Sequence, residues 1–258
     1  MDSSPGPAAT PSWVREFYDR KSRAAGPSGV LDHHVERAEA LVRLGGPGRR
    51  TVLELGAGTG GSAVAAARLG LEVTAVELSG VRAGLARDLA RDEGVDLTVV
   101  EGDFLEHDIG AGFDLVVMWN GFGVGDDAHQ RAILARAAST WLAADGLVVL
   151  DVFNPAAWIR WAGHDEVDEE TGCHETLDYD VVGSRFLDAW WFDGPDAPPL
   201  TQSVRCYSPA DLDLLVEGTG LAVTALELGD GPLTDRSAAG PASEAWGYRA
   251  VLARVAGR

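Results

Sequence analysis

The chain has 258 residues, and its 40 acidic against 21 basic side chains leave a formal net charge of −19. This length suits one α/β domain that carries an insertion. The negative charge argues against nucleic acid and anionic membranes as partners. The sequence shows neither a basic, apolar leader nor an apolar run near the roughly 20 residues that span a bilayer. We therefore expect a soluble protein that does not act on nucleic acid, and the isolated cysteines described next fit a cytoplasmic location.

The two cysteines are isolated from each other and from other metal-ligand residue types. Cys173 and Cys206 are separated by more than thirty positions. Such spacing indicates neither a zinc site nor a disulfide framework. We expect no metal.

The N-terminal region divides into a tail and a helical cap. Residues 1–12 are rich in Ser, Pro and Ala, lack periodicity and predict a flexible tail. Residues 13–48 predict a helical cap, with structure beginning near Trp13. A helix is indicated by apolar residues at helical spacing that end at a glycine-rich stop: Val35, Ala38, Leu41 and Val42, then Gly45-Gly46-Pro47-Gly48.

Residues 49–159 alternate short apolar strands with helical patterns. The expected strands are 51–55, 72–77, 96–100, 113–119 and 147–153, and the expected helices lie near 61–69, 80–93 and 127–142. This alternation is typical of βαβ units around a parallel sheet. We predict an α/β, Rossmann-like fold with helices on both faces.

From residue 160 the alternation stops, and residues 160–206 predict an antiparallel β insertion. Its expected strands are 175–182, 185–192 and 200–207, separated by Gly183-Ser184 and Gly194-Pro195. The segment 207–258 then predicts a helix and two strands. Ser208 as N-cap and Pro209 would begin the helix, which runs to Gly218 or Gly220, and the strands lie near 221–228 and 246–254.

The first strand of the predicted sheet runs directly into a glycine loop, Gly56-Ala57-Gly58-Thr59-Gly60-Gly61. Glycines allow sharp turns and close approach to a ligand, and the following helix presents unpaired N–H groups. Gly56, Gly58 and Gly61 also satisfy the dinucleotide spacing G-x-G-x-x-G. A nicotinamide-dependent oxidoreductase therefore stays open as an alternative at this point.

Three acidic residues stand at the ends of three consecutive predicted strands. Glu54 precedes the loop. Its carboxylate would repel a pyrophosphate there but attract an ammonium or sulfonium. Glu77 could accept hydrogen bonds from ribose hydroxyls. Asp103 could accept a hydrogen bond from the exocyclic amine of adenine, and Phe104 could pack on the adenine ring. Because the carboxyl ends of parallel strands share one crevice, we expect these groups to converge.

In this order the residues resemble class I S-adenosylmethionine-dependent methyltransferases over roughly residues 50–155, with 54–60 as motif I. The resemblance implies S-adenosyl-L-methionine as cofactor and a seven-stranded sheet whose last strand is antiparallel. It implies cofactor contacts at Glu54, Gly56, Ala57, Gly58, Gly60, Glu77, Leu78, Asp103, Phe104 and Asn120.

Two shorter stretches, 120–123 and 205–209, are similar to bacterial small-molecule methyltransferases, including amino-sugar N-methyltransferases with a β insertion. Those enzymes often hold a titratable residue just after the Phe-Gly-like turn, where this chain has Val124. The expected function is methyl transfer to a nitrogen or oxygen of a small-molecule acceptor. A cofactor-binding module without catalysis is the further alternative.

Catalytic candidates come from the N-terminal segment, which covers the cofactor in the resembling family. His33, His34 or Tyr18 could face the acceptor there, and a base would assist an alcohol more than an amine. Candidate acceptor contacts are Trp158, Trp161, Arg205 and Tyr207. The alternative is that the tryptophans pack in the core.

The insertion is strongly acidic. Between residues 163 and 200, eleven acids stand against Arg185 alone: Asp165, Glu166, Asp168, Glu169, Glu170, Glu175, Asp178, Asp180, Asp188, Asp193 and Asp196. They form either a solvated face or a collar that attracts a cationic acceptor. The inserted strands could also form the interface of a homodimer.

Overall fold

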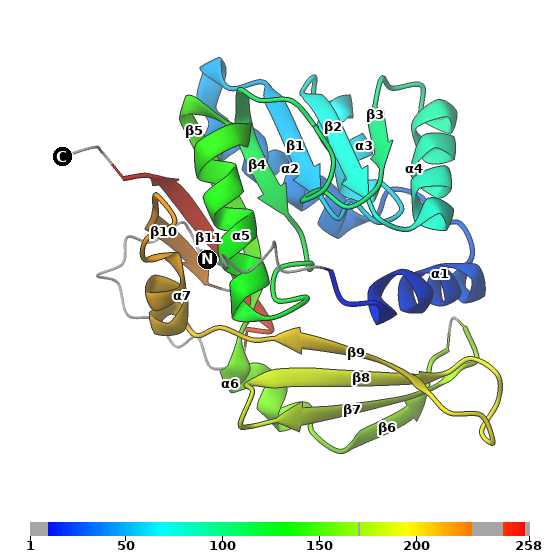
Figure 1. Cartoon of the computed structure of the whole chain (residues 1–258). Coiled ribbons are helices and arrows are strands. Elements are labelled where there is room, and N and C mark those ends of the chain that lie inside the picture. The colour runs from blue at the N-terminus through cyan, green and yellow to red at the C-terminus, as the bar shows by residue number, and fades with distance from the viewer. Residues whose placement is uncertain (1–9, 170, 229–244, 256–258) are drawn as a thin grey trace, which may run out of the picture.

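The computed structural model describes residues 10–169, 171–228 and 245–255. Most of the expected tail, and Glu170 of the insertion, lie outside these residues. The described chain forms two sheets, a seven-stranded one with helices and a smaller four-stranded one beside it (Figure 1). Among the described helices, none has the length and apolar character needed to cross a membrane.

The seven-stranded sheet has the order β10-β11-β5-β4-β1-β2-β3. Its strands are β1 (Thr51–Leu55), β2 (Glu72–Glu77), β3 (Thr98–Glu101), β4 (Phe113–Met118), β5 (Leu142–Phe153), β10 (Leu221–Leu228) and β11 (Gly247–Arg254). Strands β1 to β5 pair in parallel, whereas β11 runs antiparallel to both of its neighbours. The Rossmann-like sheet with an antiparallel last strand is thus confirmed.

Helices pack on both faces of this sheet. The described α-helices of the chain are α1 (Trp13–Ala25), α2 (Asp32–Gly45), α3 (Gly61–Arg68), α4 (Gly80–Asp92), α5 (Asp127–Arg136), α6 (Pro155–Trp158) and α7 (Pro209–Val216). Successive side chains of β4 serve opposite cores: Val116 packs with α5 and α7, and Val117 packs with α2 and α3. This alternation explains why the central strands are mostly apolar.

Several elements differ from the expected bounds, and β5 begins at Leu142 instead of residue 147. The pattern at 127–142 is not one α-helix, because α5 ends at Arg136 and a π-helical turn, Ala137–Trp141, follows it. Helix α7 ends at Val216, before either expected glycine. Its start is as expected, since the Ser208 hydroxyl accepts a hydrogen bond from the Asp211 amide at 3.1 Å.

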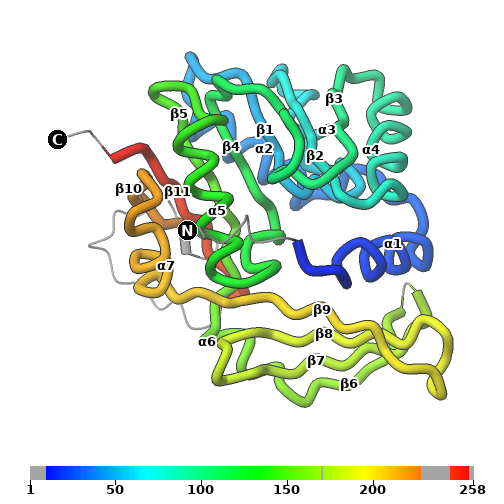
Figure 2. Tube along the Cα trace, in the orientation of Figure 1, coloured from blue at the N-terminus to red at the C-terminus, as the bar shows by residue number. Residues whose placement is uncertain are grey.

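The insertion forms the antiparallel sheet β6-β7-β8-β9. Its strands are β6 (His164–Val167), β7 (His174–Asp180), β8 (Arg185–Trp191) and β9 (Leu200–Arg205). Three of them were expected, and β6 was not. Helix α1 lies between α4 and β9 (Figure 2). Helix α1 is hydrogen-bonded to both sheets' surroundings. Asp19 accepts a hydrogen bond from the hydroxyl of Ser79, the N-cap of α4, and the Tyr18 hydroxyl donates one to Gln202 of β9.

Candidate active site

A cavity of about 610 Å³ lies between the two sheets. One wall is the carboxyl edge of the main sheet, where the glycine loop and the predicted acidic residues lie. The opposite wall is the inserted sheet, and α1 and α2 contribute the remaining sides. All predicted cofactor residues except Gly60 line this cavity: Glu54, Gly56, Ala57, Gly58, Glu77, Leu78, Asp103, Phe104 and Asn120.

The glycine loop is held in a shape that side chains would disturb. Gly56, Gly58 and Gly60 all have positive φ, at 69°, 59° and 86°. A Cβ on Gly60 would lie 2.7 Å from the Ala86 Cβ, so a close approach of the loop to α4 requires glycine there. Gly60 therefore shapes the loop from outside the cavity. The amides of Gly56 and Ala57 donate to the Val76 carbonyl, which ties the loop to β2.

Glu54 is a buried carboxyl in the cavity wall. Glu54 is the residue before the last one of β1, and it is 3% exposed. Burial raises the pKa of Glu54 to about 8, and the nearby Arg37 opposes this rise. A cation bound in the cavity would stabilise the ionised form. The residue thus suits a positively charged ligand group.

Glu77 and Asp103 are held by backbone amides. One Glu77 oxygen accepts from the Gly58 amide at 2.7 Å and the other from the Ser79 amide at 2.8 Å. Asp103 accepts from the Leu105 amide at 2.8 Å and from the Thr10 hydroxyl. Each carboxylate oxygen has a second lone pair. Both residues can therefore accept bonds from a ligand without losing their backbone donors.

Two of the three catalytic candidates, His33 and Tyr18, line the cavity. Burial lowers the pKa of His33, so its imidazole is neutral near pH 7. Tyr18 donates its hydroxyl to Gln202 Oε1 at 3.0 Å, and burial raises the pKa of Tyr18 to about 12. Tyr18 is therefore a hydrogen-bond donor near neutral pH, whereas His33 can accept a proton.

His34 also lines the cavity, but its ring is already engaged. Its Nδ1 accepts from the Leu31 amide at 3.0 Å, which closes the first turn of α2. Burial lowers the pKa of His34 to about 4. Its role is to cap the helix.

The four predicted acceptor residues separate into two groups. Trp158 lines the cavity and stacks on Phe186 of β8 with ring centroids 4.2 Å apart. Trp161, Arg205 and Tyr207 are not among the described residues of the cavity wall. Trp161 packs instead against Trp246, with ring centroids 4.6 Å apart.

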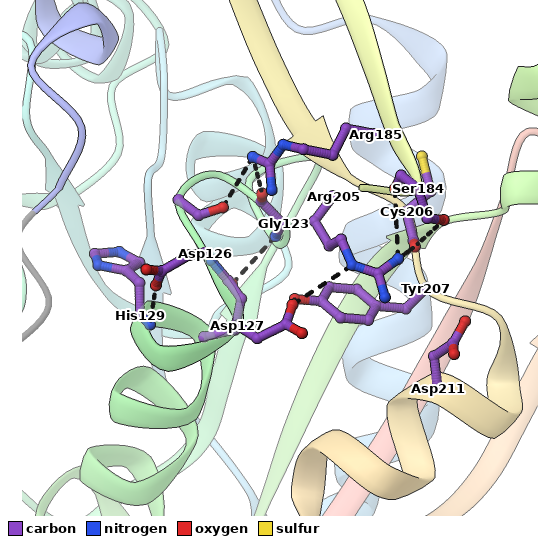
Figure 3. Close-up of polar contacts among 12 residues, drawn as sticks. Gly123, Asp126, Asp127, His129, Ser184, Arg185, Arg205, Cys206, Tyr207 and Asp211 are labelled. Atoms are coloured by element: carbon purple, nitrogen blue, oxygen red, sulfur yellow. Dashed lines mark hydrogen bonds and ion pairs between the residues drawn. The ribbon is translucent and has the colours of Figure 1, made fainter. Parts of the chain in front are cut away.

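Arg205 and Tyr207 lie at the junction of the inserted sheet with the main domain (Figure 3). The Tyr207 hydroxyl donates to Asp127 at the start of α5 at 2.7 Å, and the Arg205 Nε lies 3.5 Å from the same carboxylate. The Arg205 amide donates to the Gly123 carbonyl at 2.9 Å. These contacts fasten the junction and do not face the cavity.

The structure adds cavity residues that the sequence did not indicate, among them Lys21 of α1, Leu177 of β7 and Gln202 of β9. From the possible acidic collar, Glu175 of β7 and Asp188 of β8 line the cavity. The alternation of β7 and β8 places residues 175 and 177, and likewise 186 and 188, on one face of the sheet. That spacing was readable in the sequence. Which face meets the cavity was not.

This fold and this site define a class of protein. A Rossmann-like sheet with an antiparallel last strand, a glycine loop after β1 and acids at the ends of β1 and β2 characterise class I methyltransferases. Residues 52–146 match the family model described as "Methyltransferase domain". Residues 52–146 thus match a methyltransferase domain, and the fold around them is the one that S-adenosylmethionine-dependent methyltransferases share. The oxidoreductase alternative is not favoured.

Similar proteins are found by sequence and by structure. The cypemycin N-terminal methyltransferase of a Streptomyces species is 35% identical over 149 residues, which cover 57% of this chain and 58% of that protein. The match thus spans less than two thirds of that relative.

Two solved structures share the fold over most of their length. The CcbJ methyltransferase from Streptomyces caelestis has a TM-score of 0.69 at 23% identity, covering 94% of this chain and 96% of that one. CalS10, an amino pentose methyltransferase from Micromonospora echinaspora, has a TM-score of 0.60 at 20% identity, covering 93% and 97%.

Proposed function

We propose that this protein transfers a methyl group from S-adenosylmethionine to a nitrogen or oxygen of a small-molecule acceptor. The observation that carries the proposal is the cavity that both sheets line. Its one wall holds three acids and a glycine loop, and its other wall is the inserted sheet. A donor on the first wall and an acceptor on the second would meet inside it.

The residues of the first wall fit this cofactor in their chemistry. Glu54 suits the ammonium or sulfonium, Glu77 the ribose hydroxyls, and Asp103 the adenine amine with Phe104 packed nearby. Gly58 leaves room for a ligand because its α-carbon carries no side chain, and a Cβ there would meet just the Arg82 side chain at 3.9 Å. When bound, the cofactor would supply an electrophilic methyl on a sulfonium.

The second wall would hold and align the acceptor. Methyl transfer is an in-line displacement, so alignment of acceptor and methyl contributes much of the acceleration. Trp158 and Phe186 offer an apolar, aromatic surface for the body of the acceptor. His33 is a neutral group that could take a proton from a hydroxyl acceptor. In this division of the chain, 13–48 is the cap, 49–159 the cofactor core and 160–206 the acceptor wall.

The names of two similar proteins support a nitrogen acceptor. One is described as an N-terminal methyltransferase and the other as an amino pentose methyltransferase. Both names denote compounds that carry an amine. The structural likeness itself supports the fold.

Calorimetric titration with S-adenosylmethionine, S-adenosylhomocysteine and NAD tests the cofactor. We expect the first two to bind and NAD not to bind. Glu77→Ala should weaken S-adenosylhomocysteine binding by about 1.5–3 kcal/mol, the scale of hydrogen bonds to a charged group. The variant also leaves the Gly58 and Ser79 amides without their acceptor, so its melting temperature should be measured first. Unchanged affinity in the folded variant would refute the ribose assignment.

A further inference from the structure

The inserted sheet presents a mixed face to the cavity. Leu177, Phe186 and the adjoining Trp158 make it apolar, but Glu175 of β7 and Asp188 of β8 bring two carboxyls into the same wall. The sheet registers Glu175 opposite Trp190 and Leu177 opposite Asp188, so the two acids are diagonal neighbours. A pair of acids in an apolar wall requires an explanation, because buried charges are costly unless they are paired.

Asp188 has partners from three elements. It is 3% exposed and accepts from the Trp190 indole Nε1 at 2.5 Å and from the Gln202 amide nitrogen. The Lys21 Nζ of α1 lies 3.9 Å from its second oxygen. These donors give both carboxylate oxygens of Asp188 a partner.

Glu175 lacks a comparable set of donors. It lies diagonally across the sheet from Asp188, and burial, followed by the charge of Asp188, raises the pKa of Glu175 to about 7. The charged groups that act on it are Asp188 of β8, Lys21 of α1 and Asp168 of the turn after β6. Lys21 is the one cation among them. With all carboxyls ionised, this part of the wall has more negative than positive charge.

Trp119, which directly follows β4, also lines the cavity and is 5% exposed. Its indole Nε1 is buried and has no hydrogen-bond partner among the described residues. A buried donor without an acceptor costs about 1–3 kcal/mol. The cavity wall thus combines an unmatched donor on the main sheet with an excess of carboxyls on the inserted sheet.

We propose that the acceptor is an amine that binds as a cation against the Glu175–Asp188 pair, and that Glu175 takes its proton before methyl transfer. This inference rests on the proposed function and narrows it to nitrogen acceptors. The ammonium supplies the positive charge that the wall lacks. The aromatic and aliphatic side chains beside the pair would hold the carbon skeleton of the amine.

The proposed step is balanced. The ammonium gives one proton to the Glu175 carboxylate, which leaves a neutral nitrogen with a free lone pair. That lone pair forms the new N–C bond while the C–S bond breaks, and its electrons remain on sulfur. The products are a methylammonium and neutral S-adenosylhomocysteine. The proton on Glu175 passes to water when the product leaves.

The test compares matched amine and alcohol probes on the protein saturated with S-adenosylhomocysteine. The probes are 2-phenylethylamine with 2-phenylethanol, and benzylamine with benzyl alcohol, measured by calorimetry at pH 8. We expect each amine to bind about tenfold or more tightly than its alcohol, the effect of one hydrogen bond to a charged group. Glu175→Gln should remove this preference. Equal binding of both members in each pair, or binding by neither amine, would overturn the proposal.

Glu169→Gln is the matched control, because Glu169 is an exposed acid of the same inserted segment and lies outside the cavity wall. It should keep the amine preference. If Glu169→Gln loses the preference as fully as Glu175→Gln, the effect is one of overall charge and the proposal fails. S-adenosylhomocysteine affinity, measured separately for each variant, reports on the proposed function alone. A wild-type protein that binds it but shows no amine preference contradicts this inference and leaves the proposed function intact.

A product assay gives an independent readout. Methyl-labelled S-adenosylmethionine and a small-molecule bacterial extract are incubated with the full chain, and the products are examined by carbon-13 NMR, which separates N-methyl from O-methyl signals. Wild type and Glu169→Gln should give N-methyl products, and Glu175→Gln at least about tenfold less. O-methyl products alone, or undiminished N-methylation by Glu175→Gln, would overturn the proposal.

Discussion

The two walls of the cavity hold their acids in different ways. On the cofactor wall, Glu77 and Asp103 accept hydrogen bonds from backbone amides of neighbouring turns. On the inserted wall, Asp188 accepts hydrogen bonds from the side chains of Trp190 and Gln202, and Glu175 lies diagonally across the sheet from it. Backbone donors are present whatever the side chains are, whereas side-chain donors change with a single substitution. The first wall is therefore suited to one fixed ligand, and the second can be altered to suit different acceptors.

The backbone of the cofactor wall gives the largest expected effect. Gly60→Ala places a Cβ 2.7 Å from the Ala86 Cβ and 2.9 Å from its Cα, at a φ of +86°. Strain and overpacking together should lower the free energy of unfolding by about 2–5 kcal/mol. Gly84→Ala on α4 is the control, since nothing lies within 4 Å of its Cβ position. Urea unfolding of both variants checks this, and equal stability would mean that the loop does not need glycine there.

Glu54 sharpens the comparison because it is the acid of the cofactor wall whose pKa rises with burial. Its folded pKa of about 8 lies above its ordinary value of 4.5, so the folded state holds this proton more tightly than the unfolded state. The resulting stabilisation is complete below about pH 4.5 and is lost as pH rises to about 8. Wild type should therefore lose up to about 1.4 kcal/mol of its free energy of unfolding per pH unit in this range, and Glu54→Gln should not. The free energy of unfolding of Glu54→Gln, relative to that of wild type, should grow from pH 5 to pH 8.

The same substitution should weaken cofactor binding. Removing the carboxylate from the cation site should weaken S-adenosylmethionine affinity by about 1.5–3 kcal/mol at pH 8. Thermal unfolding and calorimetry at both pH values measure the two effects. A Glu54→Gln protein with the pH profile of wild type would show that another group carries the titration.

Asp103 tests whether the cofactor wall reads adenine. Its carboxylate should accept the adenine amine, so an analogue of S-adenosylhomocysteine with inosine in place of adenosine should bind about 1–3 kcal/mol more weakly to wild type. Asp103→Ala should reduce this difference. Competition calorimetry with both ligands measures it. Equal binding of the two ligands by wild type would exclude adenine recognition at Asp103.

Tyr207 gives the smallest expected effect and concerns the junction rather than either wall. Tyr207→Phe removes the 2.7 Å hydrogen bond to Asp127 and should cost about 0.5–1.5 kcal/mol of stability. Because Tyr207 is 1% exposed and lies outside the cavity wall, S-adenosylhomocysteine affinity should stay as in wild type. A change in S-adenosylhomocysteine affinity with unchanged stability would show that Tyr207 contributes to the binding site.

The sequence by itself determined the main sheet and the content of the cofactor wall. Strand β1, the glycine loop and α3 are consecutive in the chain, so their pattern could be read directly from residues 51–68. Glu54, Glu77 and Asp103 converge because parallel strands end at one edge. The Ser208 cap was likewise readable, since its partner amide is three residues away.

The tertiary structure alone decided the inserted wall and the junction. Tyr207 and Asp127 are 80 positions apart, and no local pattern relates them. Strand β6 was missed because its residues, His164–Val167, are mostly polar, exposed and paired on one side with β7 only. The period of two places Glu175 and Asp188 on definite faces of their strands, but it does not say which face meets the cavity. That choice depends on packing against α1 and the main sheet, where distant residues compete for the same buried surface.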